Sequence, residues 1–307
     1  ANKVWNASRF IMMNMEKNVV EEPEDFLLKP ADRWILSKVN SLTKEMTENM
    51  DKFELGIAVQ KVHDFIWDEF CDWYVEIAKY RIYHAEEDSQ SANCALWVLK
   101  TVLGQALKLL HPFMPFVTEE IFCTLQDEED SIMVSDWPVF KEEYNFVNEE
   151  HAIELMKEAV RGIRNLRTSM NVPPSRKAKV FVVSENSEVR DIFENGRSFF
   201  GTLAYANEVL VQADKEGISG DAVSAVVPES VIYIPFADLV DIEKEIERLT
   251  KEEAKLEKEL VRSKGMLSNE KFISKAPQKK IDEEKAKLEK YEQMMAQVKE
   301  RLSQLKK

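Results

Sequence analysis

The clearest hydrophobic pattern lies in the last third of the chain. Apolar side chains recur there at alternating spacings of three and four, which is typical of a coiled-coil seam. One run extends over 242–260 and another over 281–305, and Glu253 and Glu284 interrupt them. Pro277 fits the first position of the second helix. Two helices of similar length joined by a short loop predict a long antiparallel hairpin, about 40 Å long at about 1.5 Å per residue.

The preceding part of the chain begins with the spacing of amphipathic helices joined by short links. An apolar stripe runs from Val4 to Met15, and another helix begins at Pro30. Further helices are predicted over 56–83, 91–110 and 118–125. We assign the aromatic residues of the 56–83 helix to the core: Phe65, Trp67, Phe70, Trp73 and Tyr74. Helices of this length with short connections predict an up-and-down bundle.

A mixed pattern then replaces the helical one. A helix over 149–169 ends before Pro173 and Pro174. Alternating β-branched segments predict strands over 178–183, 208–212, 222–227 and 230–235, with short helices near 189–193 and 198–203. The predicted fold class is mainly α, in three domains: a helical bundle (1–145), a small α+β domain (146–238) and a long antiparallel coiled-coil hairpin (239–307).

The composition narrows the class of protein. Of 307 residues, 44% are hydrophobic and only 8 are glycine, which favours a helical globular protein. The 3 cysteines follow no disulfide spacing, so we expect a reducing, cytoplasmic compartment. No apolar run reaches about 18 residues, so we expect no membrane span. The chain lacks an initiator Met and starts inside a predicted helix, so we expect it to be a piece of a longer protein.

The charge is unevenly distributed. The formal net charge is −14, yet residues 238–307 carry 18 Lys/Arg against 16 Asp/Glu, which leaves a net charge of −16 on the first 237 residues. Overall acidity argues against indiscriminate nucleic-acid binding. Residues 159–184 nevertheless hold six basic residues and no acid, and residues 260–281 hold six and one. Two basic patches on an acidic protein suggest a shaped polyanion touched at defined points, while a solvated face and a lysine-rich helix surface remain the simpler alternative.

Motifs for catalysis or metal binding do not occur. There is no G-x-x-x-x-G-K-[ST] or G-x-G-x-x-G sequence. The four histidines are scattered and none has metal-ligand spacing, so we interpret them as structural. No Ser or Cys has the context of a nucleophile. We therefore expect no catalytic residue, no metal and no cofactor in this chain, and a complete hydrolase is the weakest of the hypotheses.

Several blocks resemble class I aminoacyl-tRNA synthetases for branched aliphatic amino acids. They are NKVWNASRF (2–10), ADRWILS (31–37), FIWDEFCDWYVE (65–76) and LHPFMPFVTEEI (110–121). The stretches RGIRNLR (161–167) and MNVPP (170–174), and the basic loop with Phe272, Lys275, Ala276 and Pro277, are similar to the valyl-tRNA synthetase family. The resemblance covers essentially the whole chain and places it in the C-terminal portion of a bacterial-type member.

This resemblance implies an anticodon-binding bundle followed by a tRNA-binding arm. The implied partners are tRNA(Val) and the enzyme's own upstream catalytic domain, and a monomer is expected. The HIGH and KMSKS adenylation motifs and the editing domain are absent from this sequence. The ATP-dependent joining of valine to tRNA therefore belongs to the parent enzyme, and we expect this chain alone to be inactive.

Candidate contact residues fall into three zones. For the anticodon they are Asn6, Arg9, Asn14, Phe26 and Arg33; for a tRNA stem, Arg161, Arg164 and Arg167; for the outer corner of the tRNA, Arg262, Lys264, Asn269, Lys271, Phe272 and Lys275. Lysine and arginine bind phosphates, and an aromatic ring can stack on an exposed base. Structural alternatives stay open: a salt bridge for Arg9, a buried staple for Phe26, partial burial for Arg167 and a hairpin cap for Phe272.

An alternative function belongs to another class. The coiled coil could pair with a helix of another chain, so that the protein would be an interaction scaffold without RNA binding. A protein-binding coiled coil does not need the net charge of +5 that residues 260–281 carry. Intermolecular pairing also predicts a dimer, which light scattering would detect.

Overall fold

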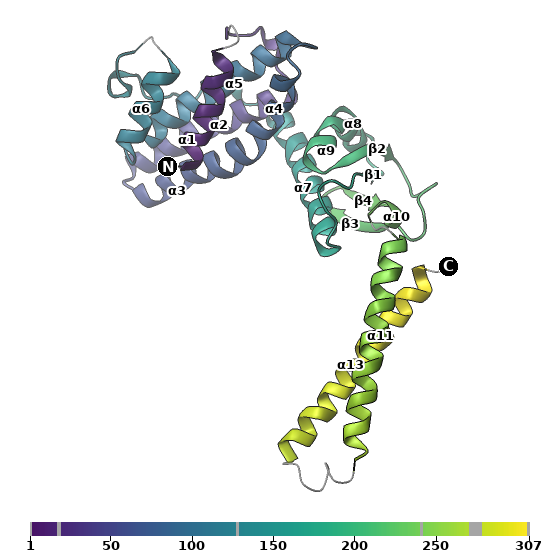
Figure 1. Ribbon diagram of the computed structural model, residues 1–307. Coiled ribbons are helices and arrows are strands. Elements are labelled where there is room, and N and C mark those ends of the chain that lie inside the picture. Colours follow the sequence, from purple (N-terminus) through teal and green to yellow (C-terminus); the bar gives the residue numbers. More distant parts are fainter. Residues whose placement is uncertain (1, 17–19, 127–128, 240–241, 270–277, 306–307) are drawn as a thin grey trace. The chain divides into compact units, whose positions relative to one another are not determined.

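The computed structural model describes the chain except for residues 1, 17–19, 127–128, 240–241, 270–277 and 306–307 (Figure 1). It is mainly helical with one small sheet, as the sequence predicts. The chain forms two compact units, Ala1–Ile234 and Pro235–Lys307. The boundary predicted near residue 238 lies close to this division, while the boundary predicted at 145 within the first unit stays a prediction.

Helices of the first unit follow the predicted order. They are α1 (Asn2–Met15), α2 (Pro30–Asp51), α3 (Leu55–Asp64), η2 (Phe65–Tyr74), α4 (Val75–Tyr83), α5 (Ser89–Leu110), α6 (Pro115–Leu125) and α7 (Val147–Ser169), with short 3-10 turns η1 (Asp25–Leu27), η3 (Ile132–Val134) and η4 (Glu142–Tyr144). Pro30 opens α2, and the Asp32 carboxylate accepts a hydrogen bond from the Lys29 backbone N–H at 2.9 Å. The Asp88 side chain caps α5 by accepting from the Ser91 N–H.

The helix predicted over 56–83 is interrupted by a π-helical segment. η2 has i→i+5 bonds, as in the bond from the Val75 N–H to the Phe70 carbonyl. The wider turn buries residues at a spacing of five and four, so that Phe65, Phe70 and Tyr74 all enter the core. Trp67 differs from the prediction: it is only half-buried, and its ring stacks on His63 at 4.3 Å.

A four-stranded mixed sheet completes the first unit. Its elements are β1 (Ala178–Val183), α8 (Ser187–Asn195), α9 (Arg197–Leu203), β2 (Ala206–Gln212), β3 (Val223–Val227) and β4 (Ser230–Ile234). The strand order is β2-β1-β4-β3; β1 pairs in parallel with β2 and antiparallel with β4, and β3–β4 is the predicted hairpin. α7 packs on β3 at Gly162, where a Cβ would lie 2.9 Å from Val227 Cγ1. Glycine therefore allows the close approach of helix and strand.

The second unit contains α10 (Phe236–Leu239), α11 (Ile242–Leu267) and α13 (Gln278–Leu305). α11 and α13 lie side by side and run in opposite directions (Figure 1), because Glu253 is near Lys299 whereas Ser263 is near Glu284. The cluster between them comes from the predicted seam: Leu249, Leu256, Met295, Val298 and Leu302. Glu284 lies at a seam position although it is charged. Its carboxylate accepts a hydrogen bond from the buried Ser263 hydroxyl at 2.7 Å, which explains how it can be buried there.

Candidate nucleic-acid interface

One face of α1 is exposed and carries two of the predicted anticodon residues. Asn6 and Arg9 lie on it, and Trp5 and Met13 on the same face are 43% and 55% exposed. The opposite face is buried in the bundle. Asn14 is half-buried, and its side-chain amide donates to the Phe10 carbonyl at 2.7 Å. α1 therefore presents Asn6 and Arg9 to solvent, whereas the Asn14 side chain is held by its own helix.

The exposed ring of Tyr83, at the end of α4, lies beside α1. The Phe10 and Tyr83 rings meet edge to face at 6.3 Å, and the Lys79 ammonium lies 5.6 Å from the Phe10 ring centre. Tyr83 is 67% exposed. Unpaired bases stack on aromatic rings, and a neighbouring cation attracts the RNA backbone. Tyr83 and Lys79 were not among the residues predicted from the sequence, because nothing in the helical period tells a solvent-facing tyrosine from a core one.

The other two anticodon candidates, Phe26 and Arg33, have different environments. Phe26, in η1, is 73% exposed and so is not the buried staple that was the alternative. Arg33 is engaged within the fold: it pairs with Glu149 at 3.4 Å, donates to the Asp25 carbonyl at 3.2 Å and lies over the Phe146 ring. These contacts give Arg33 a structural explanation that needs no RNA.

The three arginines of α7 have three different environments. Arg161 is exposed and pairs with Glu158. Arg164 is also exposed, and its Nε donates to the Leu203 carbonyl at 2.8 Å. Arg167 is only 3% exposed. Phosphate contact from this helix is therefore open to Arg161 and Arg164.

Arg167 holds the turn that follows α7. One of its Nη groups donates to the carbonyls of Pro173 and Arg176, at 3.0 and 2.6 Å, and the guanidinium lies over the Tyr205 ring. Burial lowers the pKa of this arginine below its usual value. Arg167 is therefore buried, which was the alternative to RNA contact, and we withdraw the predicted stem contact for this residue.

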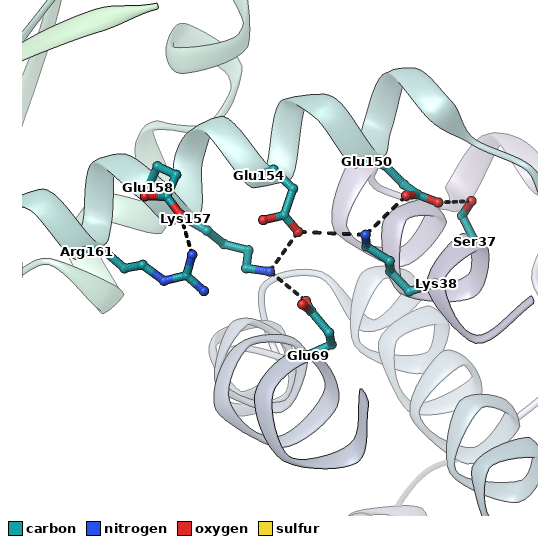
Figure 2. A network of polar contacts seen from close by, with 8 residues as sticks. All are labelled: Ser37, Lys38, Glu69, Glu150, Glu154, Lys157, Glu158 and Arg161. Atoms are coloured by element: carbon teal, nitrogen blue, oxygen red, sulfur yellow. Dashed lines mark hydrogen bonds and ion pairs between the residues drawn. The ribbon is translucent and has the colours of Figure 1, made fainter. Parts of the chain in front are cut away.

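A polar network joins the first half of α7 to the bundle (Figure 2). The Lys157 ammonium bonds Glu69 of η2 at 2.6 Å and Glu154 at 2.8 Å, and Lys38 of α2 pairs with Glu150 at 3.2 Å. The Lys157 side chain is only 1% exposed. Buried charges need such partners. The network fixes α7 against the bundle and so sets where its arginines emerge.

A second buried network lies inside the bundle. Arg81 bonds both oxygens of the fully buried Asp32, at 2.7 and 2.8 Å, and the Tyr74 hydroxyl donates to Asp32 at 2.6 Å. Burial and the neighbouring carboxylate raise the pKa of Tyr74 well above its usual value. Burial first, and Asp32 second, raise the pKa of Cys94 to about 11. These groups are locked into the core and offer no reactive side chain.

The structure describes half of the predicted arm residues. Arg262 is exposed and pairs with Glu259 at 3.4 Å, and Lys264 pairs with Glu292 of α13 at 2.8 Å. Asn269 follows the end of α11 and has a partner within the chain. The other three candidates lie outside the described residues: Lys271, Phe272 and Lys275.

A cleft of about 710 Å³ lies between the bundle and the helices α7, α8 and α9. Its charged lining is mixed, with Glu149, Glu188 and Asp191 against Lys29 and Arg81, so the cleft has no excess of positive charge to attract phosphate. In the described part of the chain, no three His, Cys, Asp or Glu side chains are grouped as a metal site would require. Nor does any helix of that part combine the length and apolar character needed to cross a bilayer.

Comparison with known proteins gives two family matches in the order of the two units. Residues 32–182 match the anticodon-binding domain of tRNA ligases, and residues 241–306 match the tRNA-binding arm of valyl-tRNA synthetase. Valine–tRNA ligases of Clostridium perfringens and Clostridium tetani are 48% and 50% identical over 306 and 307 residues, 99% and 100% of this chain. The chain belongs to the valine–tRNA ligase family. It spans about a third of the length of these relatives, 34% in each case.

The two family matches assign the candidate contact residues to different parts of the chain. The anticodon-binding match runs from α2 to β1 and includes Arg161 and Arg164, while the arm match includes Arg262, Lys264 and the three undescribed candidates. α1 precedes the first family match, so its exposed face is included only in the alignments with the valine–tRNA ligase relatives. The recognition made from the sequence blocks is confirmed, whereas the individual contact residues stay predictions.

Proposed function

We propose that this chain is the tRNA-binding portion of a valine–tRNA ligase. In this proposal the bundle receives the anticodon loop of tRNA(Val), α7 contacts a stem, and the second unit grips the outer corner of the tRNA. The observation that carries it is the pair of family matches, anticodon-binding domain and tRNA-binding arm, on one chain and in that order. The exposed aromatic and basic side chains of α1, α4 and α7 support it.

The activity itself would come from the rest of the longer protein. The sequence lacks the adenylation motifs, and the chain is about a third of the length of its relatives. We therefore assign ATP binding, valine activation and transfer to the catalytic portion of a cytoplasmic parent enzyme. The present chain would supply binding energy and identity, and would have no ligase activity alone.

For the arm we propose an antiparallel coiled-coil hairpin that binds RNA at its loop end. The apolar seam of α11 is filled by α13 of the same chain. A seam filled internally does not need a helix from another molecule. This supports a monomeric RNA-binding arm over the scaffold alternative, which predicts a dimer.

The anticodon assignment is tested by binding to valine tRNA and to the same tRNA with its anticodon replaced. We expect the replacement to weaken binding about tenfold, the loss of roughly one base-specific hydrogen bond. Arg9→Ala should weaken binding to valine tRNA and reduce the difference between the two RNAs. Arg197→Ala is the matched control, because Arg197 is also an exposed arginine of the first unit and lies on α9 rather than α1. Equal binding of both RNAs to the unaltered chain would refute the assignment of the bundle to the anticodon.

A further inference from the structure

Two arginines of α7 lie over one tryptophan of the bundle. The guanidinium carbons of Arg161 and Arg164 are each 5.5 Å from the centre of the Trp73 ring. Trp73 is 5% exposed, so the ring is fixed by the core around it. A cation is attracted to the face of an indole, which limits where each guanidinium can lie. Trp73 therefore holds two exposed arginines next to each other at one point of the surface.

These two arginines differ in what occupies their donors. The Nε of Arg164 donates to the Leu203 carbonyl at 2.8 Å, and no described residue is seen to bond its two Nη groups. An Nη group of Arg161 is instead taken by the Glu158 carboxylate, one turn earlier on the same helix (Figure 2). One guanidinium is thus anchored with its outer donors open, while the other is occupied by an internal acid.

Of the three carboxylates near this site, Glu158 differs from Glu69 and Glu154 in its ion pairs. Glu69 and Glu154 both bond the Lys157 ammonium, which lies 5.7 Å from the same Trp73 ring. Lys157 therefore compensates part of their charge, and Lys38, 4.0 Å from Glu154, adds a second cation. Glu158 has no such partner apart from Arg161 among the described contacts, and its side chain keeps 41% exposure.

We propose that Arg161 and Arg164 over Trp73 form a two-arginine site for an RNA backbone phosphate, and that Glu158 is its internal competitor. The proposal rests on the proposed tRNA-binding function. Arg164 meets a phosphate directly, whereas Arg161 does so by exchanging Glu158 for it. An exposed ion pair contributes little and is easily replaced, while guanidinium and phosphate form bidentate, charge-assisted bonds. Glu158 therefore weakens RNA binding at this site without reading any base.

The chain offers a matched control pair. Glu194 and Arg197 are also three residues apart on exposed helical turns of the first unit, with side-chain exposures of 41% and 48% against 41% and 45% for Glu158 and Arg161. Arg197 shows no ring contact among those described. Glu194→Gln therefore removes the same charge from the same kind of pair at a place without the tryptophan platform.

The test uses the full 307-residue chain and unmodified transcripts of a valine tRNA and a non-cognate tRNA, with affinity measured over a salt series. Glu158→Gln should tighten binding to both transcripts about threefold, because a like charge next to the phosphate is removed and phosphate contacts carry no sequence information. The log–log salt slope should become steeper by up to about 0.9. Glu194→Gln should change neither quantity. Arg161→Ala combined with Glu158→Gln should lose the gain.

Equal gains from Glu158→Gln and Glu194→Gln would overturn the proposal, since net charge alone would then explain them. A gain that persists without Arg161 would overturn it as well. If the unaltered chain binds valine tRNA with anticodon preference but Glu158→Gln changes nothing, the competitor assignment fails and the proposed function stands. Absence of binding to either tRNA at low salt would overturn both.

Discussion

Lys157 offers the sharpest test of how the bundle holds α7. Its ammonium lies 2.6 Å from Glu69 and 2.8 Å from Glu154, and its side chain is 1% exposed. It also lies 5.1 and 5.7 Å from the ring centres of Trp34 and Trp73. Replacing the residue by alanine removes both ion pairs and leaves a cavity between two indoles. Replacing it by methionine keeps most of the volume and removes only the charge.

The expected losses differ because the two carboxylates are not equally trapped. Breaking a fully buried ion pair costs about 3–5 kcal/mol. The Glu69 and Glu154 side chains keep 25% and 39% exposure, so water can solvate them once the lysine is gone. We therefore expect the lost ion pairs to cost about 1 kcal/mol, below that range, and Lys157→Ala to lower the free energy of unfolding by about 3 kcal/mol once the cavity is added. Lys157→Met should cost about 1 kcal/mol, because packing against the rings is retained.

Urea unfolding followed by tryptophan fluorescence reports on this site, since two indoles flank the lysine. Lys38→Met is the matched control: its ammonium pairs with Glu150 at 3.2 Å, but its side chain is 28% exposed, so we expect a loss below about 1 kcal/mol. A loss below about 1 kcal/mol for Lys157→Ala would refute the claim that the buried lysine fixes α7.

Two further predictions concern stability. Ser263→Ala should lower the free energy of unfolding of the α11–α13 pair by about 1–2 kcal/mol, because Glu284 loses its buried hydrogen-bond donor. Circular dichroism of the second unit measures this loss. That hydrogen bond lowers the folded pKa of Glu284 below 4.5, so the stabilisation that it gives is present above pH 4.5 and is lost as pH falls through the folded pKa. The stability of Ser263→Ala should therefore depend less on acid pH than that of the unaltered chain. An unchanged dependence of stability on acid pH would contradict this role of Ser263. Burial raises the folded pKa of Cys71 and Cys94 from 9.0 to about 11, so the stability of the first unit should fall as pH rises from 9 towards 11. The loss should be about 2 kcal/mol at about pH 10 in urea titrations, and a Cys71→Ala/Cys94→Ala variant that keeps the full loss would show that other groups cause it.

The elements of the fold could be predicted from the sequence where burial follows a regular period. The seam spacing over 242–260 and 281–305 predicted α11 and α13, and Pro30 marked the start of α2. The π-helical turn in η2 could not be predicted, because it depends on packing five residues apart rather than on the helical period. Glu284 appeared as a gap in the seam, and only the facing Ser263 explains it.

The site could be predicted only as sets of side chains. Three arginines spaced by three residues look alike in the sequence, yet one is buried by a turn that folds back after α7. The Pro173 and Arg176 carbonyls that hold Arg167 come from that turn, and its course is a tertiary property. The Trp73 platform under Arg161 lies 88 residues away in the chain, so no local pattern could reveal it.

Sequence blocks were informative in a different way. They supported the family, and the two family matches confirm it. They did not distinguish Arg33, which is engaged with Glu149 and the Asp25 carbonyl, from Arg9, which is exposed. Exposure and hydrogen bonding therefore narrow the candidate list in a way that a motif cannot.

We infer that this chain binds tRNA with separate roles for its two units. The most direct measurement is the affinity for valine tRNA and a non-cognate tRNA over a salt series, with the full chain and with residues 240–307 removed. We predict a preference for valine tRNA that survives the removal, together with a smaller salt slope, because the bundle supplies identity and the arm supplies phosphate contacts. Failure of the full chain to bind either tRNA at low salt would contradict a tRNA-binding function for both units.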